Sequence, residues 1–320
     1  MPTKQEIVQA GEALRRGIAT PQTKTVVDEW RKDHAYPLQH LYISLNRAHK
    51  ALISQRLKRF TSIQQKLQRM ESMSLWQMQD LGGCRVIVPE ISDLASAVAV
   101  SLPGTFIKKR EKNYVDSPKT SGYRSIHHIF SYEKNDNYHG ILLEIQYRTR
   151  MQHLWATAVE MMSIGETFNV KASEADPNVL RFFADVSSLF AIEEQTPLVP
   201  GTPANRKELL QEIVDLNESD GILARLEAKK ILCNFVAEKG VNLRKGLFLL
   251  RLDNQKLVLN VSYHEKIDEA INAYNLAEND PQINAVLVKA GVFKKMKMAY
   301  PNYFMDISRF IATVRALVIK

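Results

Sequence analysis

Cysteine is scarce in this chain of 320 residues, and long apolar runs are missing. The two cysteines, Cys84 and Cys233, lie far apart between apolar neighbours, so we expect buried thiols and neither a disulfide framework nor a zinc site. Every apolar run is shorter than the roughly 20 residues that a membrane-spanning helix needs. The residues after Met1 are polar and lack the pattern of a signal peptide. We therefore expect a cytoplasmic protein that does not contact a membrane.

The common nucleotide-binding motifs are also missing. The sequence contains no GxxxxGK[ST] loop and no glycine-rich kinase loop, so the folds built on those motifs are not supported. What the chain does have is an excess of positive charge, formally +8, from 43 lysines and arginines against 35 acidic residues. Such an excess favours anionic partners, either nucleotides or nucleic acid.

The spacing of apolar residues predicts an α+β protein. From Lys4 to about Arg69, apolar residues recur every three or four positions, which is typical of helices. Beyond this segment, runs rich in β-branched and aromatic residues predict a mixed β-sheet flanked by helices, and the last two runs are separated like the strands of a hairpin. The predicted strands are residues 84–90, 105–109, 123–132 and 140–149, and the predicted helices are 91–102 and 150–164.

A domain boundary is predicted where proline clusters. Residues 193–206 hold three prolines and one glycine, which is the composition of a linker. We therefore expect one domain at residues 1–195 and a second at residues 205–320. The second is predicted to be mostly helical, with one β-hairpin that turns at Asp253–Gln255.

Polar side chains in a buried-looking strand are the most informative anomaly. Glu144, Gln146 and Arg148 alternate along an otherwise apolar run, so they share one face of the predicted strand. A charged residue there is costly unless it is paired or bound to a metal. Asp80 lies just before a glycine pair that leads into another strand, where it could hold Mg²⁺ or merely cap a turn. Two such carboxylates near a basic cluster are the minimum set for Mg²⁺-assisted phosphoryl-type transfer from a nucleoside triphosphate.

Two further segments hold residues of the same kind. Arg56, Lys58 and Lys66 lie in a predicted helix, whose basic face taken alone would simply be solvated. The stretch 117–130 combines a glycine, a tyrosine, an arginine and two adjacent histidines. Because neighbouring residues of a strand point to opposite faces, at most one of those histidines can face a given site.

The order of these motifs resembles the synthetase domain of the RelA/SpoT alarmone enzymes, over residues 25–165. The matching elements are Arg56, Lys58, Ser62 and Lys66, then Asp80, Gly83 and Arg85, then Gly122 to His127, then Glu144 to Thr149, and finally Trp155 and Ala156. The resemblance implies a nucleotidyltransferase-like fold. It also implies transfer of pyrophosphate from ATP to the ribose 3′-hydroxyl of GDP or GTP, which makes (p)ppGpp-type alarmones.

The resemblance also implies roles for single residues. Arg56 and Arg85 would sandwich the adenine of ATP, and Lys58 and Lys66 would contact its phosphates. Asp80 and Glu144 would hold Mg²⁺, and Glu144 would accept the proton of the attacking hydroxyl. Tyr123 would stack on the acceptor base, with His127 beside it. The remaining acceptor-binding residues would be Gly122, Arg124, Gln146 and Arg148.

Departures from the family pattern leave the acceptor open. The loop before Tyr123 reads KTSGY where KPNGY is frequent, and the helix after Trp155 reads ATAVE. A basic loop, Lys108–Lys119, would suit tRNA, so pyrophosphorylation of the tRNA 3′ CCA end, as by toxin-like relatives, is the alternative. An inactive sensor that binds nucleotide or RNA is a second alternative. No hydrolase half is expected, and the C-terminal domain is predicted to regulate the site or dock the substrate.

Overall fold

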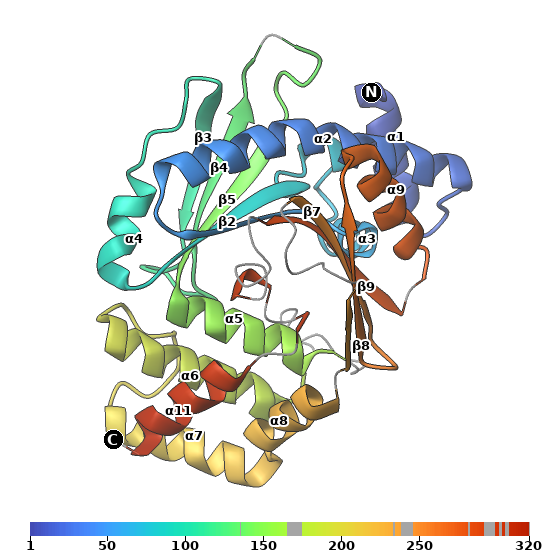
Figure 1. Ribbon diagram of the computed structural model, residues 1–320. Coiled ribbons are helices and arrows are strands. Elements are labelled where there is room, and N and C mark those ends of the chain that lie inside the picture. Colours follow the sequence, from blue (N-terminus) through green and yellow to red (C-terminus); the bar gives the residue numbers. More distant parts are fainter. Residues whose placement is uncertain are drawn as a thin grey trace.

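Two β-sheets organise the chain (Figure 1). The computed structural model describes residues 1–134, 136–164, 175–232, 234–237, 246–280, 282–290, 298–300, 303–304 and 307–319. The first sheet has the order β1-β2-β5-β4-β3, and its strands are β1 (Leu52–Leu57), β2 (Gly82–Val88), β3 (Phe106–Asn113), β4 (Ile126–Tyr132) and β5 (Leu142–Thr149). The second has the order β6-β8-β7-β9, and its strands are β6 (Asn234–Ala237), β7 (Gly246–Asp253), β8 (Val258–His264) and β9 (Ile283–Ala290).

The first sheet has one apolar face and one polar face. Its apolar face packs under α2 (Pro21–Ala48) and α1 (Lys4–Arg15), and together they form one hydrophobic core. The helix α5 (Arg150–Met162) lies on the opposite side of the sheet, directly after β5 (Figure 1). The turn from β5 into α5 is stabilised by Thr149, whose side chain accepts a hydrogen bond from the backbone N–H of Gln152. The polar face of the first sheet is therefore the one that faces α5 (Figure 1).

The prediction of helical structure from Lys4 to about Arg69 was wrong at β1. Residues 52–57 form an edge strand that pairs antiparallel with β2, and α3 (Phe60–Arg69) follows. Hydrogen bonds to β2 stabilise this strand, and the local spacing of apolar residues does not reveal a partner that lies far along the chain. Arg56 therefore lies on a strand and Lys66 on a helix, so the two do not share a helix face.

The other strands of the first sheet were predicted well. The hairpin of β4 and β5 is confirmed, as are β2 and the helix α4 (Ile91–Val98). The strand β3 is longer than predicted, because it runs to Asn113 and pairs with β4. The first part of the predicted basic loop is therefore strand. Cys84 is buried as expected, whereas Cys233 lies outside the described residues.

The C-terminal part contains more strand than predicted. The hairpin of β7 and β8 is confirmed, and β6 and β9 extend it into a sheet. One face of this sheet packs on α9 (Ile267–Ala277), which stands on its outer side in Figure 1. The remaining helices are α6 (Pro177–Glu194), α7 (Arg206–Asp220), α8 (Ile222–Leu232) and α11 (Ser308–Ile319). Among the residues described, no helix has both the length and the apolarity to cross a membrane.

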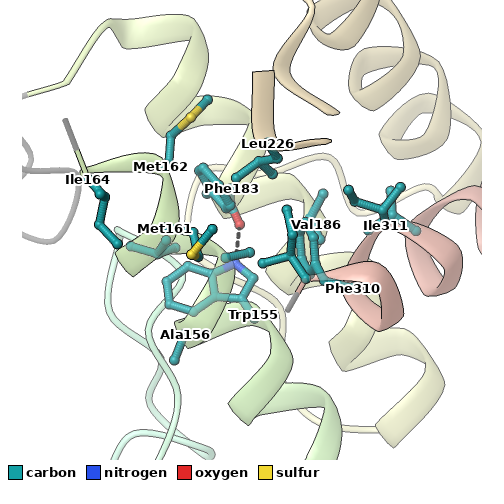
Figure 2. Close-up of a cluster of buried hydrophobic side chains, with 14 of the residues drawn as sticks. Trp155, Ala156, Met161, Met162, Ile164, Phe183, Val186, Leu226, Phe310 and Ile311 are labelled. Carbon is teal, nitrogen blue, oxygen red and sulfur yellow. Dashed lines mark hydrogen bonds between the residues drawn. The ribbon is translucent and has the colours of Figure 1, made fainter. Parts of the chain in front are cut away.

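The proline-rich segment 193–206 does not separate two hydrophobic cores. Figure 2 displays one cluster in which Trp155 of α5 and Phe183 of α6 lie close to Leu226 of α8 and Phe310 of α11. The indole N–H of Trp155 donates to the carbonyl of Phe183 at 2.7 Å. Because residues before and after the segment share this core, the segment is a surface connection between packed helices. The predicted domains at 1–195 and 205–320 are thus joined through a common interior.

Candidate active site

Strand register brings most predicted site residues onto one face. In neighbouring strands, residues that pair directly point to the same side of the sheet. Arg56, Gly83 and Glu144 pair in one row across β1, β2 and β5. The next row contains Arg85, and it continues through β5 to β4 with Gln146 and His127. These rows lie on the polar face, and His128 points to the opposite, apolar side, where it is buried near Tyr147.

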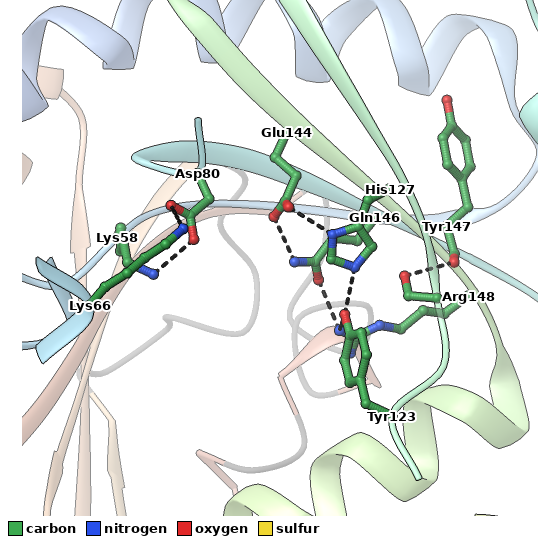
Figure 3. Close-up of polar contacts among 10 residues, drawn as sticks. Lys58, Lys66, Asp80, Tyr123, His127, Glu144, Gln146, Tyr147 and Arg148 are labelled. Atoms are coloured by element: carbon green, nitrogen blue, oxygen red, sulfur yellow. Dashed lines mark hydrogen bonds and ion pairs between the residues drawn. The ribbon is translucent and has the colours of Figure 1, made fainter. Parts of the chain in front are cut away.

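Five predicted residues close a ring of hydrogen bonds (Figure 3). Arg148 donates to the hydroxyl of Tyr123 at 2.7 Å and to the side-chain oxygen of Gln146 at 2.9 Å. The Tyr123 hydroxyl and Nε2 of His127 are 2.7 Å apart, and Nδ1 of His127 is 2.8 Å from Glu144. Gln146 donates to the second oxygen of Glu144 at 2.7 Å. The carboxylate of Glu144 thus has two partners in the ring, His127 on one oxygen and Gln146 on the other.

One assignment of protons satisfies the whole ring. If Nδ1 of His127 carries the proton and donates to Glu144, then Nε2 accepts from the Tyr123 hydroxyl, which in turn accepts from Arg148. Burial raises the pKa of Glu144, but the hydrogen bonds that it accepts from His127 and Gln146 act in the opposite direction, and the net shift is downward. Glu144 is therefore ionised at neutral pH and can accept a proton.

Asp80 forms the second acidic position. Its two carboxylate oxygens are each 2.9 Å from an ammonium group, one of Lys58 and one of Lys66. Burial raises the pKa of Asp80, but the two positive charges outweigh it and hold the pKa well below its ordinary value. Lys58 follows β1 directly and Lys66 lies on α3, so the fold brings both predicted phosphate-binding residues to one carboxylate.

These residues line one cleft. Its lining contains both carboxylates, Asp80 and Glu144, and both predicted adenine-binding arginines, Arg56 and Arg85. Gly83 also lines the cleft, and a Cβ there would lie 3.1 Å from the backbone oxygen of Glu144, so glycine keeps this wall flat. We name this space the reaction cleft. It is lined by Ser54, Gln55, Arg56, Asp80, Gly83, Cys84, Arg85, Glu144, Gln146 and Tyr300.

Both arginines of the reaction cleft are buried, and the negative charge of Glu160 acts on each of them. Burial, together with the nearby charges of Arg148 and Arg56, lowers the pKa of Arg85 to about 10. Its Nε is buried and has no hydrogen-bond partner among the described residues. A guanidinium in this state can stack on a base or pair with an anion.

Tyr300 was not predicted as a site residue. It is 5% exposed, and its hydroxyl donates to the backbone oxygen of Gln55 at 2.5 Å. The space left for water-sized solvent in the cleft is about 30 Å³. Lysines and aromatic residues are interleaved at residues 293–304, which is a weak sequence signal for a binding segment; residues 293–297, 301 and 302 of that stretch lie outside the described residues.

Gly122 and Arg124 do not join the ring of hydrogen bonds. Gly122 has φ of +90°, and a Cβ there would come within 2.8 Å of the Trp155 ring. Arg124 is 3% exposed and does not line the reaction cleft. Its guanidinium donates to Ser187 at 3.0 Å and to the carbonyl of Pro197 at 2.7 Å. Both residues thus fix the loop that carries Tyr123. The prediction that Arg124 binds the acceptor is therefore replaced by a role in positioning that loop.

The basic residues near the site are partly paired. Lys108 is 3.0 Å from Glu111, and Lys109 is 3.0 Å from Glu133. Lys119 lies over the ring of Tyr123, with its ammonium 5.4 Å from the ring centre. The free positive charge beside the site is therefore smaller than the sequence suggests.

Two carboxylates could hold a divalent cation here. Asp80 and Glu144 line the same cleft and offer only oxygen atoms, the ligands that Mg²⁺ prefers. No group of three or more histidine, cysteine or acidic side chains with metal-binding geometry occurs within the described residues. A Mg²⁺ ion held by this pair would complete its coordination with substrate phosphates and water, as Mg²⁺ commonly does. The residues present fit that ion.

Comparison with known proteins gives a family match over the segment that contains these residues. Residues 55–163 match the family model described as a region found in RelA/SpoT proteins. These residues are a RelA/SpoT region. The resemblance predicted for residues 25–165 is confirmed for this segment, which contains every predicted site residue.

Relatives of the RelA/SpoT region include a curated enzyme and solved structures. GTP pyrophosphokinase YwaC of Bacillus subtilis (strain 168) is 33% identical over 110 residues, which are 32% of this chain and 52% of YwaC. The chain thus spans about half the length of this relative. Small alarmone synthetase 1 of Bacillus subtilis, solved with its product pppGpp, aligns over 52% of this chain and 93% of its own, with 22% identity and a TM-score of 0.45. A GTP pyrophosphokinase family protein of Streptococcus pneumoniae aligns over 62% and 95%, with 20% identity and a TM-score of 0.43.

Proposed function

We propose that this protein is an ATP-dependent pyrophosphokinase that acts on the ribose 3′-hydroxyl of GDP or GTP. The observation that carries the proposal is the ring of hydrogen bonds that includes Glu144. Glu144 lines the same cleft as Asp80, which pairs with Lys58 and Lys66. An ionised carboxylate that is oriented from two sides and faces a cationic cleft suits a proton acceptor.

In this reaction the 3′-hydroxyl oxygen of the acceptor attacks the β-phosphorus of ATP. A new O–Pβ bond forms, the bond between Pβ and the oxygen that bridges it to Pα breaks, and AMP leaves. Glu144 takes the proton of the attacking hydroxyl, while Lys58 and Lys66 can leave Asp80 to contact the phosphates. Mg²⁺, when held by Asp80 and Glu144, would neutralise charge on the transferred phosphates.

Two groups of residues on the polar face, one of arginines and one around Tyr123, determine where we place the two nucleotides. The guanidinium groups of Arg56 and Arg85 would bind the adenine of ATP by stacking. Tyr123 would stack on the acceptor base, beside His127. Its ring now has the ammonium of Lys119 at 5.4 Å and the guanidinium of Arg148 at 5.1 Å, so a base that stacks there must displace one of them.

The acceptor is tested by following a labelled phosphate. With γ-labelled ATP, Mg²⁺ and separately GDP, GTP or bulk tRNA, we expect label on the guanine nucleotide. Label on tRNA alone would replace our acceptor with the CCA end. No labelled acceptor, with nucleotide still bound, would leave only a binding protein and refute the pyrophosphokinase.

Variants connect this activity to the cleft. Asp80→Asn should abolish transfer, because the carboxylate that contacts both lysines is lost. Glu133→Gln is a matched control, since Glu133 pairs with Lys109 and does not line the reaction cleft. Full activity of the Asp80→Asn protein would contradict the assigned site.

We also propose that the C-terminal part controls access to the reaction cleft. The space of about 30 Å³ beside Tyr300 is far below the roughly 300 Å³ or more of typical ligand pockets, so a nucleotide needs Tyr300 to move. The C-terminal part is attached to the first part of the chain by an ion pair of 2.6 Å between Arg31 and Glu278, at the end of α9, and by a hydrogen bond of 2.6 Å from Arg59 to Asn284 of β9. Regulation through this attachment is the role that we assign to residues 205–320.

A further inference from the structure

A buried carboxylate at the end of α6 has no part in the reaction described above. Glu194 is 7% exposed and is the last residue of α6. One of its oxygens accepts from the hydroxyl of Thr149, and the other accepts from the side-chain N–H of Gln152 at 2.9 Å. The side chains of Thr149 and Gln152 also accept from each other's backbone N–H. Glu194 thus completes the hydrogen bonds of the turn that joins β5 to α5.

The same carboxylate provides the counter-charge of the buried Arg124. Among the described residues the guanidinium of Arg124 forms no ion pair, and its partners are neutral oxygens, those of Ser187 and Thr196 and the carbonyls of Val115 and Pro197. Burial lowers the pKa of Arg124 to about 10, and the charge of Glu194 acts in the opposite direction. Burial likewise raises the pKa of Glu194, against its two hydrogen bonds and the charge of Arg124. Because a buried cation without a nearby anion is costly, Glu194 stabilises Arg124 in its present position.

Arg124 and Thr149 each lie next to a residue of the hydrogen-bonded ring. Tyr123 precedes Arg124 in the chain, and Arg148 precedes Thr149. These two neighbours meet in the bond of 2.7 Å from Arg148 to the hydroxyl of Tyr123. Glu194 therefore acts on the backbone behind both partners of that bond, by charge on one side and by hydrogen bonding on the other.

We propose that Glu194 is a positioning residue, which fixes the ring of Tyr123 against the polar face and so determines how tightly the acceptor binds. It does not line the reaction cleft, and it acts through Arg124 and Thr149. The inference rests on the proposed function in one respect, namely that Tyr123 stacks on the acceptor base. Precise placement matters there because a shift of about 1 Å in a group that positions a substrate can cost about 10²-fold in rate.

Amide hydrogen exchange on the full-length protein tests this positioning without any substrate. Glu194→Gln preserves the volume of the side chain but removes its charge, so exchange should become at least fivefold faster in residues 117–125. Exchange in α2 should stay as in wild type, which distinguishes a local effect from a general loss of stability. Glu193→Gln is the matched control, because Glu193 is exposed, precedes Glu194 on the same helix and pairs with Arg206. It should exchange like wild type.

Initial rates connect the positioning with the acceptor. Glu194→Gln should raise the KM for GDP at least fivefold and leave the KM for ATP within twofold, because the arginines assigned to ATP line the reaction cleft and Glu194 does not. Glu194→Asp keeps the charge but is one methylene shorter, so its KM for GDP should lie between those of wild type and Glu194→Gln. The Asp variant decides the question if Glu194→Gln does not fold.

Three outcomes would overturn the inference. They are unchanged exchange in residues 117–125, a KM for GDP that stays at the wild-type value, and an equal rise of the KM for GDP and for ATP. If tRNA proves to be the acceptor, its KM replaces that of GDP. If wild type transfers pyrophosphate to no acceptor, the proposed function fails, and hydrogen exchange alone then decides the role of Glu194.

Discussion

Replacing Tyr300 with phenylalanine should make ATP bind more tightly. The substitution keeps the ring in the segment but removes the hydroxyl that donates to the backbone oxygen of Gln55 at 2.5 Å. Tyr300 lines the cleft assigned to ATP, so nucleotide binding requires a state in which it has withdrawn. When the competent state is rarely populated, the apparent affinity falls by that fraction, and weakening the closed state restores it.

The magnitude follows from the hydrogen bond that is lost. A hydrogen bond of this type contributes about 0.5–1.5 kcal/mol, and about 1.4 kcal/mol corresponds to a tenfold change in equilibrium. We therefore expect the KM for ATP to fall by about 2- to 12-fold in Tyr300→Phe. The free energy of unfolding should fall by about 1 kcal/mol, because the same bond is missing from the folded state.

Initial rates at varied ATP and saturating acceptor measure this effect, with thermal unfolding recorded in parallel. Tyr132→Phe is the matched control, because its hydroxyl is also buried and donates to Asp136 at 3.3 Å on the apolar side of the sheet. The control should lose stability without a change in KM. A KM for ATP that rises in Tyr300→Phe would refute the reasoning, because Tyr300 would then assist ATP instead of obstructing it.

Three further predictions concern other parts of the molecule. Glu144→Gln should lower kcat by about 10²- to 10⁴-fold with a cooperative thermal transition retained, since it removes the proton acceptor; near-normal kcat would leave Glu144 as a structural residue. Gly122→Ala should lower the free energy of unfolding by about 1–3 kcal/mol in a denaturant titration, because φ is +90° and the new Cβ would lie 2.8 Å from the Trp155 ring; an unchanged midpoint would contradict this packing. Asp185 is fully buried, and burial raises its pKa to about 7 against the opposing effect of Arg181. The free energy of unfolding should therefore fall as pH rises from about 4 to 7, because Asp185 ionises less readily in the folded state than in the unfolded state. Asp185→Asn should therefore raise the Tm at pH 8 more than at pH 4, and an equal change at both pH values would count against the shifted pKa.

The sequence alone determined the residues of the polar face. Glu144, Gln146 and Arg148 alternate, and the two-residue period of a strand puts them on one side whatever the partner strands are. The opposite orientation of His127 and His128 has the same local origin. For this reason the alternation in β5 and the hairpin with β4 could be predicted from the local order of residues, whereas the glycine pair after Asp80 lies inside β2 and does not form a turn.

Only the tertiary structure decided how distant segments meet. The edge strand β1 exists because β2 pairs with it, and a helical spacing of apolar residues concealed this pairing. Arg124 lies next to Tyr123 in the sequence and was predicted to bind the acceptor with it. In the folded protein its side chain instead contacts Ser187 of α6 and Pro197. Tyr300 reaches the cleft from more than 200 residues beyond Gln55, through a contact that no local pattern encodes. Local periodicity determines which face a side chain occupies, whereas long-range packing determines what it touches there.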